Sequence, residues 1–240
     1  MKGIILAGGT GTRLRPMTLI MNKHLLPVGK YPMIHYAISK MAAVGIEEIM
    51  LVTSKQSAGL FTEYIGDGRT WNVSVTYKTQ ETAGGIAQAL GLTESFVKPS
   101  EKLMVLLGDN LFEDTLKEAV DAFRLQGQGA HVFLKKVDDP QRYGVPELLN
   151  GRIVRIVEKP KVAPTSFAVT GIYLYDGGVY DVIRSVRPSA RGELEITDVN
   201  NAYAEQEKLS YNLLTGWWTD AGTHRSLLEA GIRLMERDGT

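Results

Sequence analysis

Short apolar runs alternate with helical patterns through the first 135 residues, and this alternation constrains the fold more than any other feature. Buried strands are predicted at residues 3–6, 48–52, 73–77, 102–107 and 130–134. Apolar residues at 116, 119, 120 and 123 recur at helical spacing after Asp114, which we expect to cap that helix. Another helix should begin near Pro32 and end at Gly45. Strands that alternate with helices indicate a parallel sheet joined by right-handed crossovers.

The second half of the chain has a different rhythm. After Pro140, strand-like segments at 153–157 and 168–175 precede helical patterns at about 193–205 and 223–236. We interpret this half as an extension of the same sheet, because a chain of 240 residues fits one α/β domain of the common size of about 200 to 250 residues. The sequence therefore predicts a single α/β domain with a parallel sheet that the second half of the chain extends.

The composition excludes several classes of protein. The 27 basic and 27 acidic side chains balance, so no overall positive field would hold nucleic acid or an anionic membrane. There are no cysteines, which rules out disulfides, cysteine-bound zinc and thiol catalysis and suits a reducing cytoplasm. No segment approaches the roughly 20 apolar residues of a membrane span. We expect a cytoplasmic protein whose partners are small molecules, with no nucleic acid and no membrane among them, and self-association as a homo-oligomer is left open.

A glycine-rich segment follows the first predicted strand and reads GGTGTRLRP from Gly8 to Pro16. Its glycines would let backbone amides approach phosphate oxygens, and Arg13 adds positive charge. The segment lacks the lysine of a Walker A loop, and Leu14 stands where a dinucleotide-binding motif has its third glycine, which argues against a nicotinamide-dependent dehydrogenase. An ordinary glycine-rich turn is the alternative for this segment alone, and the nearby cation Lys23 favours phosphate binding.

A series of short motifs runs in order along the chain: LAGGTGTRL at 6–14, KHLLPV at 23–28, PMI at 32–34, GIAQA at 85–89, LGDN at 107–110, RYGV at 142–145, EKP at 158–160, VTG at 169–171, RGELEITD at 191–198 and WWTD at 217–220. In these motifs the chain resembles the sugar-nucleotide pyrophosphorylases, and specifically the glucose-1-phosphate thymidylyltransferases. Each motif alone is a weak signal, whereas their order over nearly the whole chain is a strong one. The resemblance implies a single Rossmann-like, GT-A-like nucleotidyltransferase domain over residues 1–240, a three-layer α/β/α fold with a predominantly parallel mixed central sheet. It also implies a nucleotide-binding half at 1–135 and a sugar-phosphate-binding half at 136–240.

The resemblance also implies a reaction. A member of this family would transfer dTMP from dTTP to α-D-glucose 1-phosphate, giving dTDP-glucose and pyrophosphate, by in-line attack of a sugar-phosphate oxygen on the α-phosphorus. Such an enzyme would serve nucleotide-sugar biosynthesis, for example the route to dTDP-rhamnose. The chemistry requires that two polyanions be held in line while charge on the α-phosphate and the leaving group is stabilised. A cluster of cations and a divalent metal ion are therefore expected.

Two carboxylates fit the metal role. Asp109 follows the predicted strand 102–107 and Asp220 follows a pair of tryptophans, and Mg²⁺ prefers few protein carboxylates supplemented by phosphate oxygens and waters. Asp109 alone could equally be a turn aspartate, but the resemblance implies that both aspartates bind Mg²⁺. It further implies Arg13 at the β- and γ-phosphates and Lys23 at the α-phosphate and pyrophosphate. The expected catalytic set is therefore Arg13, Lys23 and Asp109.

The binding residues are carried over from the same resemblance. Around the nucleotide it implies Leu6, Gly8, Gly9, Thr10, Gly11, Thr12, Arg13, His24, Gln80, Gly85 and Asp109. The side chain of Gln80 can supply both a donor and an acceptor to the edge of a pyrimidine. Around the sugar phosphate the resemblance implies Tyr143, Gly144, Glu158, Lys159, Val169, Thr170 and Arg191. Lys159 and Arg191 would bind the phosphate there, while Glu158 would accept hydrogen bonds from sugar hydroxyls.

Two features depart from the family pattern. His24 stands where longer thymidylyltransferases commonly have glutamine, so the base contact at this position is open. The chain ends at Thr240, whereas longer members continue with helices that build a regulatory nucleotide site, which we expect to be missing. Two other functions stay open: a pyrophosphorylase that uses UTP or another hexose 1-phosphate, and a non-catalytic regulatory subunit, which should have lost the metal aspartates or the phosphate-binding cations.

Overall fold

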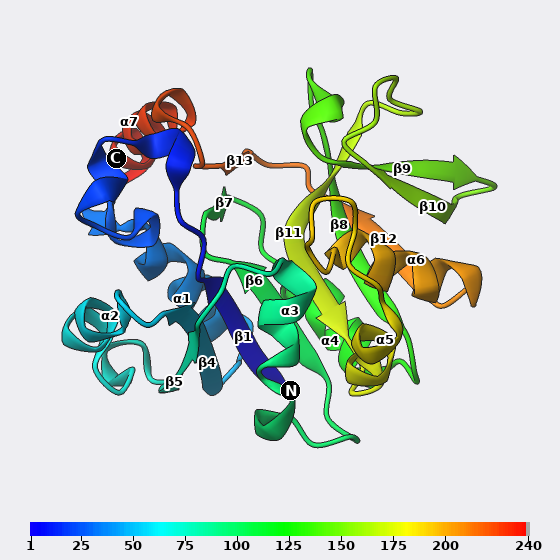
Figure 1. The fold of residues 1–240 in the computed structure, drawn as a ribbon, viewed down its shortest axis with the longest axis horizontal. Coiled ribbons are helices and arrows are strands. Elements are labelled where there is room, and N and C mark those ends of the chain that lie inside the picture. Colours follow the sequence, from blue (N-terminus) through cyan, green and yellow to red (C-terminus); the bar gives the residue numbers. More distant parts are fainter. Residues whose placement is uncertain (239–240) are drawn as a thin grey trace.

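The computed structural model describes residues 1–238 and has one central sheet of seven strands (Figure 1). The strands stand in the order β12-β8-β11-β6-β1-β4-β5. Their bounds are β1 Lys2–Ala7, β4 Glu48–Ser54, β5 Ser74–Gln80, β6 Leu103–Leu107, β8 Ala130–Lys136, β11 Phe167–Tyr175 and β12 Leu209–Leu213. The strands predicted at 3–6, 48–52, 73–77, 102–107, 130–134 and 168–175 are present in this sheet, with their ends shifted by a few residues. The strand predicted at 153–157 as part of the same sheet is β10 Arg152–Glu158, which pairs in a separate two-stranded sheet.

The sheet is predominantly parallel. β5, β4, β1 and β6 run parallel to one another, and β8 runs parallel to β12. Within this sheet of the described chain, β11 alone is antiparallel to its neighbours, β6 and β8. β1 is a nearly continuous apolar run that is buried along almost its whole length, as expected for a central strand covered on both faces. The predicted mixed sheet is confirmed, and β11 from the second half of the chain is inserted between two strands of the first half.

Helices cover both faces of the sheet (Figure 1). On one face the helices are α1 Met33–Ala43, α2 Ala58–Ile65 and α4 Lys117–Leu125, which share a buried cluster that includes Phe61 and Phe123. On the other face they are α3 Ile86–Gly91, α5 Val179–Ser185 and α6 Ile196–Glu205, which share a second cluster that includes Val179 and Val199. Because side chains alternate between the two faces of a strand, each face of the sheet supplies one cluster, and the predicted three layers are confirmed.

Three two-stranded sheets and one further helix complete the fold. The strand pairs are β2 Pro27–Val28 with β3 Tyr31–Pro32, β7 Asn110–Phe112 with β13 Trp218–Asp220, and β9 Gly144–Leu149 with β10 Arg152–Glu158. The last helix, α7 His224–Asp238, packs through Ala230 and Leu234 in a small cluster with Val28. It therefore lies beside the loops that follow β1 (Figure 1). None of the helices in residues 1–238 is both long and apolar enough to cross a membrane.

The helix ends test two of the predicted signals. α1 begins directly after Pro32, and Gly45 follows its end with a φ of 75°, a left-handed conformation that glycine adopts without strain. The prediction that Asp114 caps α4 is wrong, because the N-cap of this helix is Leu116. The Asp114 carboxylate instead accepts hydrogen bonds from the backbone N–H groups of Thr215 and Gly216, at 2.8 and 2.9 Å. Asp114 therefore binds a segment that is distant in the sequence and does not cap the nearby helix α4.

Candidate active site

A cavity of about 700 Å³ opens where β1, β5 and β6 end. These strands are parallel, so their carboxyl ends meet at one edge of the sheet, which is where α/β proteins bind their ligands. The sequence-predicted residues that line the cavity are Leu6, Gly8, Gly9, Thr10, Thr12, Arg13, Lys23, His24, Gln80, Gly85, Asp109, Tyr143, Gly144, Glu158, Lys159, Val169, Arg191 and Asp220. Segments from nearly the whole length of the chain therefore meet in one space.

Two predicted residues do not line the cavity. Gly11 has a φ of 63°, and a β-carbon there would meet the methyl carbon of Thr18 at 2.9 Å, so the shape of the loop requires a glycine at this position, and its contact with a nucleotide stays a prediction. Thr170 is fully buried, and its hydroxyl donates to the carbonyl of Phe133 at 2.9 Å. The prediction that Thr170 lines the sugar pocket is corrected, because its strand neighbours Val169 and Gly171 line the cavity instead.

Asp109 and Lys23 form a buried ion pair on the cavity wall. The Lys23 ammonium contacts Oδ2 of Asp109, and the Asn110 side-chain amide donates to Oδ1 at 3.1 Å. Only 8% of Asp109 is exposed. Burial alone would raise the pKa of Asp109, but the charge of Lys23 and these hydrogen bonds lower that pKa below its ordinary value. Asp109 is therefore a carboxylate at neutral pH.

Asp220 is the second carboxylate of the site. The short pairing of β7 with β13 sets Asp220 opposite Asn110, which brings it close to Asp109. The Tyr143 hydroxyl donates to Oδ1 of Asp220 at 3.1 Å. Burial and the negative charge of Asp109 together raise the pKa of Asp220. Two carboxylates that repel one another in a partly buried place favour a cation between them.

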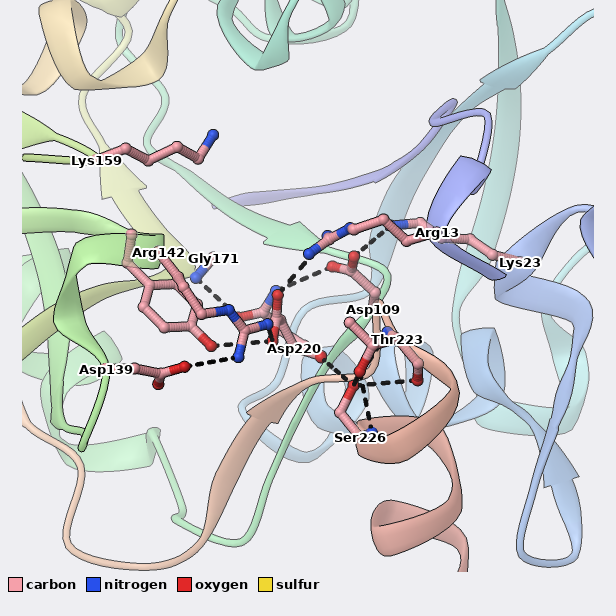
Figure 2. A network of polar contacts seen from close by, with 12 residues as sticks. Arg13, Lys23, Asp109, Asp139, Arg142, Lys159, Gly171, Asp220, Thr223 and Ser226 are labelled. Atoms are coloured by element: carbon pink, nitrogen blue, oxygen red, sulfur yellow. Dashed lines mark hydrogen bonds and ion pairs between the residues drawn. The ribbon is translucent and has the colours of Figure 1, made fainter. Parts of the chain in front are cut away.

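Two arginines approach Asp220 from opposite sides (Figure 2). Nη2 of Arg13 lies 3.9 Å from Oδ2, and Nη2 of Arg142 lies 3.9 Å from Oδ1. Both guanidinium groups are substantially exposed, with 57% and 42% of their side chains accessible to solvent. Arg142 is also held by Asp139, whose Oδ2 accepts from its Nη1 at 3.0 Å. Arg13, which is accessible and loosely paired, can turn to an incoming phosphate at little cost.

The donor set of the site suits magnesium. No group of three or more His, Asp and Glu side chains that could hold a metal ion occurs in the described part of the chain. A site with two aspartates, Asp109 and Asp220, leaves coordination positions for phosphate oxygens and waters, which is the arrangement that Mg²⁺ favours over an all-protein cage. Oxygen donors alone also match the absence of cysteine from the sequence.

His24 is a neutral, fixed ring beside these charges. It is 2% exposed, and burial followed by the charge of Lys23 lowers its pKa to about 3. Oδ1 of Asn22 accepts from the His24 backbone N–H at 3.0 Å and lies 2.8 Å from the ring Nδ1. An oxygen can only accept, so Nδ1 must carry the proton of the neutral ring. Asn22 therefore holds His24 in one tautomer, and a contact of His24 with the base stays a prediction.

Gln80 and Gly85 line the cavity at the end predicted for the nucleotide. Gln80 closes β5 with 7% exposure, and its amide nitrogen donates to the side-chain oxygen of Gln88 at 2.5 Å. Gly85 has a φ of 103°, and a β-carbon there would meet the carbonyl oxygen of Leu194 at 2.4 Å. Backbone hydrogen bonds join residues 84–87 to Leu194. This contact connects the nucleotide end of the cavity to the end predicted for the sugar.

The predicted sugar end carries a chain of paired charges. Nζ of Lys159 lies 3.1 Å from Oε1 of Glu158, and the Thr197 hydroxyl donates to Oε2 of Glu158 at 2.8 Å. Arg191 donates to both carboxylate oxygens of Glu195 at 2.9 Å and lies 3.6 Å from Glu158. Lys159 and Arg191 therefore hold positive charge at the cavity mouth, paired with carboxylates.

Sequence reasoning missed two residues that organise the site. Oδ1 of Asn110 accepts from the Gly171 backbone at 2.8 Å and from the Trp218 indole at 2.9 Å, while its nitrogen holds Asp109. Asn110 thus joins β7, β11 and β13. Arg142 was overlooked as well, although it begins a quoted motif. Both are adjacent to residues that were predicted, so the signal was present in the motifs at 107–110 and 142–145.

The comparisons with known proteins agree with this geometry. The family model described as nucleotidyl transferase matches residues 2–237. A glucose-1-phosphate thymidylyltransferase of Xanthomonas campestris pv. campestris is 45% identical over 239 residues, which cover 95% of this chain and 79% of that protein. One of Neisseria meningitidis is 43% identical over 238 residues, which cover 96% of this chain and 81% of that protein.

Two solved structures share the fold. A proposed glucose-1-phosphate thymidylyltransferase from Bacillus anthracis, in complex with sucrose, superposes with a TM-score of 0.94 at 52% identity over 98% of this chain and 96% of that one. A UDP-glucose pyrophosphorylase in complex with UDP-glucose superposes with a TM-score of 0.87 at 23% identity, over 98% of each chain. At 23% identity, the second structure supports a shared fold and carries no argument about substrates.

Proposed function

The chain belongs to the nucleotidyl transferase family, and from that premise we propose that it transfers dTMP from dTTP to α-D-glucose 1-phosphate, giving dTDP-glucose and pyrophosphate. The main support for the proposal is that two carboxylates and two cations line one cavity beside a glycine-rich loop. These residues are Asp109, Asp220, Lys23 and Arg13. Relatives that are 43% and 45% identical are named glucose-1-phosphate thymidylyltransferase, which supports this choice of substrates.

The nucleotide would bind to the half formed by residues 1–135. Backbone amides of the loop that includes Gly8 to Thr12 can donate to the phosphates, because the loop follows β1 at the ligand edge of the sheet. Arg13 would bind the β- and γ-phosphates, with its exposed guanidinium free to turn toward them. Leu6, Gln80 and Gly85 would contact the base. We propose that His24, which is neutral because it is buried beside Lys23 and is held in one tautomer by Asn22, packs beneath the nucleotide without adding charge.

Asp109 and Asp220 would hold a Mg²⁺ ion. When bound, this ion would polarise the α-phosphate and neutralise charge on the departing pyrophosphate. Lys23 would keep its ammonium beside the α-phosphate and stabilise the charge that develops there. Asn110 and Tyr143 would fix the two carboxylates through their hydrogen bonds. No side chain has to form a covalent bond, because an oxygen of the sugar phosphate is itself the nucleophile.

The sugar phosphate would bind to the half formed by residues 136–240. Lys159 and Arg191 would exchange their carboxylate partners, Glu158 and Glu195, for the phosphate dianion. Glu158 would then accept hydrogen bonds from sugar hydroxyls, with Tyr143, Gly144 and Val169 as the walls of the pocket. A non-catalytic regulatory role is less well supported, because the chain retains both aspartates and both phosphate-binding cations in one cavity. We also propose that the enzyme works in the cytoplasm, where nucleoside triphosphates are made.

A pyrophosphate-release assay tests the proposal. Purified protein would be incubated with each of dTTP, UTP, dCTP and dATP against glucose, galactose, mannose and N-acetylglucosamine 1-phosphates, with Mg²⁺ or with a chelator. We expect the highest kcat/KM for dTTP with glucose 1-phosphate, and no turnover with the chelator. A higher kcat/KM for UTP or for another sugar phosphate would replace the proposed substrates, and full activity with the chelator would remove the metal from the account.

A further inference from the structure

The side chains of Gln80 and Gln88 form an amide pair at the nucleotide end of the cavity. The Gln80 nitrogen Nε2 donates to Oε1 of Gln88 at 2.5 Å. Gln80 lines the cavity from the end of β5, whereas Gln88 lies one step away on α3 and is not part of the lining. Gln88 does not face the cavity itself, and its hydrogen bond reaches the cavity through Gln80.

Glycines make room for both amides. A β-carbon on Gly8 would stand 2.3 Å from Oε1 of Gln80, and one on Gly84 would stand 3.1 Å from the amide carbon of Gln88. Oε1 of Gln80 thus lies over Gly8, on the cavity side, while Nε2 points to Gln88. With 7% of Gln80 exposed, little space remains for its amide group to reorient while Gln88 holds the nitrogen.

The direction of the Gln80 amide decides which base edge it matches. An amide oxygen only accepts hydrogen bonds, and an amide nitrogen only donates them. An oxygen turned to the cavity accepts from the N3–H that thymine and uracil share. Cytosine carries no hydrogen on N3, so its N3 would face the Gln80 oxygen as a second acceptor. A buried polar group left facing a like group costs much more than a hydrogen bond gains.

We propose that Gln88 is a positioning residue that sets the pyrimidine specificity of the site by holding the Gln80 amide with its oxygen toward the base. This inference rests on the proposed function, in which Gln80 contacts the base. Gln88 selects the keto pyrimidines without touching them, because it offers an acceptor to the Gln80 nitrogen and so leaves the oxygen for the nucleotide.

Three substitutions of Gln88 separate this role from simple packing. Gln88→Glu keeps an acceptor of the same shape, so the Gln80 amide should keep its direction. Gln88→Met keeps the length and removes the acceptor, so the amide is free to turn over. Gln88→Lys offers only donors and should draw the Gln80 oxygen toward itself, which turns the nitrogen to the base. Gln206→Met is the matched control, because Gln206 is exposed at the C-terminal end of α6, outside the cavity, and its amide donates to the backbone of Ala202.

The readout is the ratio of dissociation constants for dCTP and dTTP, measured by titration calorimetry, and the same ratio in kcat/KM. Gln88→Met should lower the selectivity for dTTP by about tenfold, the scale of one neutral hydrogen bond. Gln88→Lys should lower it by about 100-fold, since one contact is lost for dTTP and one is gained for dCTP. Gln88→Glu and Gln206→Met should stay within about twofold of the wild type, and the ratio of UTP to dTTP should not change in any variant.

The outcomes distinguish the inference from the function on which it rests. Equal losses of affinity for dTTP and dCTP in Gln88→Met and Gln88→Lys would overturn the positioning role and leave the proposed function intact. Absence of turnover by the wild type with dTTP and glucose 1-phosphate would overturn the function, while the binding ratios would still decide the role of Gln88. Thermal unfolding of each variant shows whether a loss comes from folding, and a changed ratio in a stable Gln88→Lys protein supports the proposal.

Discussion

The two ends of the cavity are built differently. At the predicted nucleotide end three polar side chains are buried and fixed: His24, Gln80 and Asp109 are 2%, 7% and 8% exposed, and each has a hydrogen-bond partner, whereas Arg13 is exposed, at 57%. At the sugar end, Lys159 and Arg191 have half-exposed side chains, at 50% and 45%, paired with carboxylates. We therefore expect one end to be organised before its ligand arrives and the other to exchange ion pairs when its ligand binds. The difference predicts where a substitution will affect kcat and where it will affect KM.

The largest effect should follow loss of a carboxylate at the buried end. We expect Asp109→Asn and Asp220→Asn each to lower kcat on the order of 10³-fold, because the charge that would hold the metal is lost while the shape remains. Pyrophosphate release measures the change, and Asp138→Asn, at an exposed acid outside the cavity, is the control. Activity close to wild type in either variant would remove that aspartate from the metal site.

The cations beside those carboxylates should differ in their effect on stability. Lys23→Met and Arg13→Met should each lower kcat by about 10² to 10³-fold, the effect of removing one preorganised donor. Lys23→Met should also lower the free energy of unfolding by about 3 kcal/mol, because Asp109 would be left buried without its partner. Arg13→Met should change stability by less than about 1 kcal/mol, since its ion pair is long and exposed. Equal stability losses in chemical denaturation would contradict the comparison.

The buried pair also predicts a pH dependence of stability. Lys23 lowers the pKa of Asp109 in the folded protein, so the unfolded chain takes up a proton first as the pH falls. The stabilisation is complete above the unfolded pKa of about 3.9 and is lost as the pH falls from there toward the lower folded pKa. Below about pH 4 the wild type should therefore lose stability more steeply than Lys23→Met. Parallel acid profiles of the two proteins in urea denaturation would count against the ion pair.

Substitutions at the sugar end should raise the KM for the sugar phosphate. Lys159→Met and Arg191→Met should each raise the KM for glucose 1-phosphate by about tenfold, the value of one exposed charge-assisted contact, with little change in kcat. The KM for dTTP should stay constant. Steady-state kinetics with each substrate varied in turn checks both statements. A fall in kcat with an unchanged KM would place these cations at the reacting phosphorus and not at the sugar phosphate.

The smallest effect expected is a salt effect. Exposed charges are screened at high ionic strength and buried pairs are screened much less. Raising the salt concentration from about 0.05 to 0.3 M should raise the KM for glucose 1-phosphate by roughly threefold, and the KM for dTTP should rise less. A larger effect on dTTP would show that the nucleotide end depends on exposed charges after all, and the contrast between the two ends would have to be reversed.

Local sequence patterns explain much of the fold. The buried strands read as apolar runs, and Gly45 ended the first helix where its left-handed conformation was expected. Strand alternation could have improved the site prediction as well, since Val169 and Gly171 must share one face of β11 and Thr170 the other. The error at Thr170 came from carrying over a whole motif where the period of the strand separates its members.

The remaining features depend on contacts between distant segments. Asp114 has the composition of a cap, but its partners are Thr215 and Gly216, about a hundred positions further along the chain. β11 lies between β6 and β8, and hydrophobic periodicity predicts that a strand forms but not which strands it pairs with. The Gln80–Gln88 pair joins a strand to a helix across a loop. Motifs name such residues, but only the assembled structure shows which of them face one another.

The most direct test of the account is a ³¹P NMR spectrum of the reaction itself. Wild-type protein, dTTP, glucose 1-phosphate and Mg²⁺ would be followed until the substrates are consumed. Attack on the α-phosphorus predicts that pyrophosphate and a sugar-linked diphosphate grow in equal amounts, while the resonance of glucose 1-phosphate falls in step, and that Asp220→Asn forms neither at a comparable rate. Growth of inorganic phosphate with dTDP, or consumption of dTTP while glucose 1-phosphate persists, would contradict nucleotidyl transfer at this site.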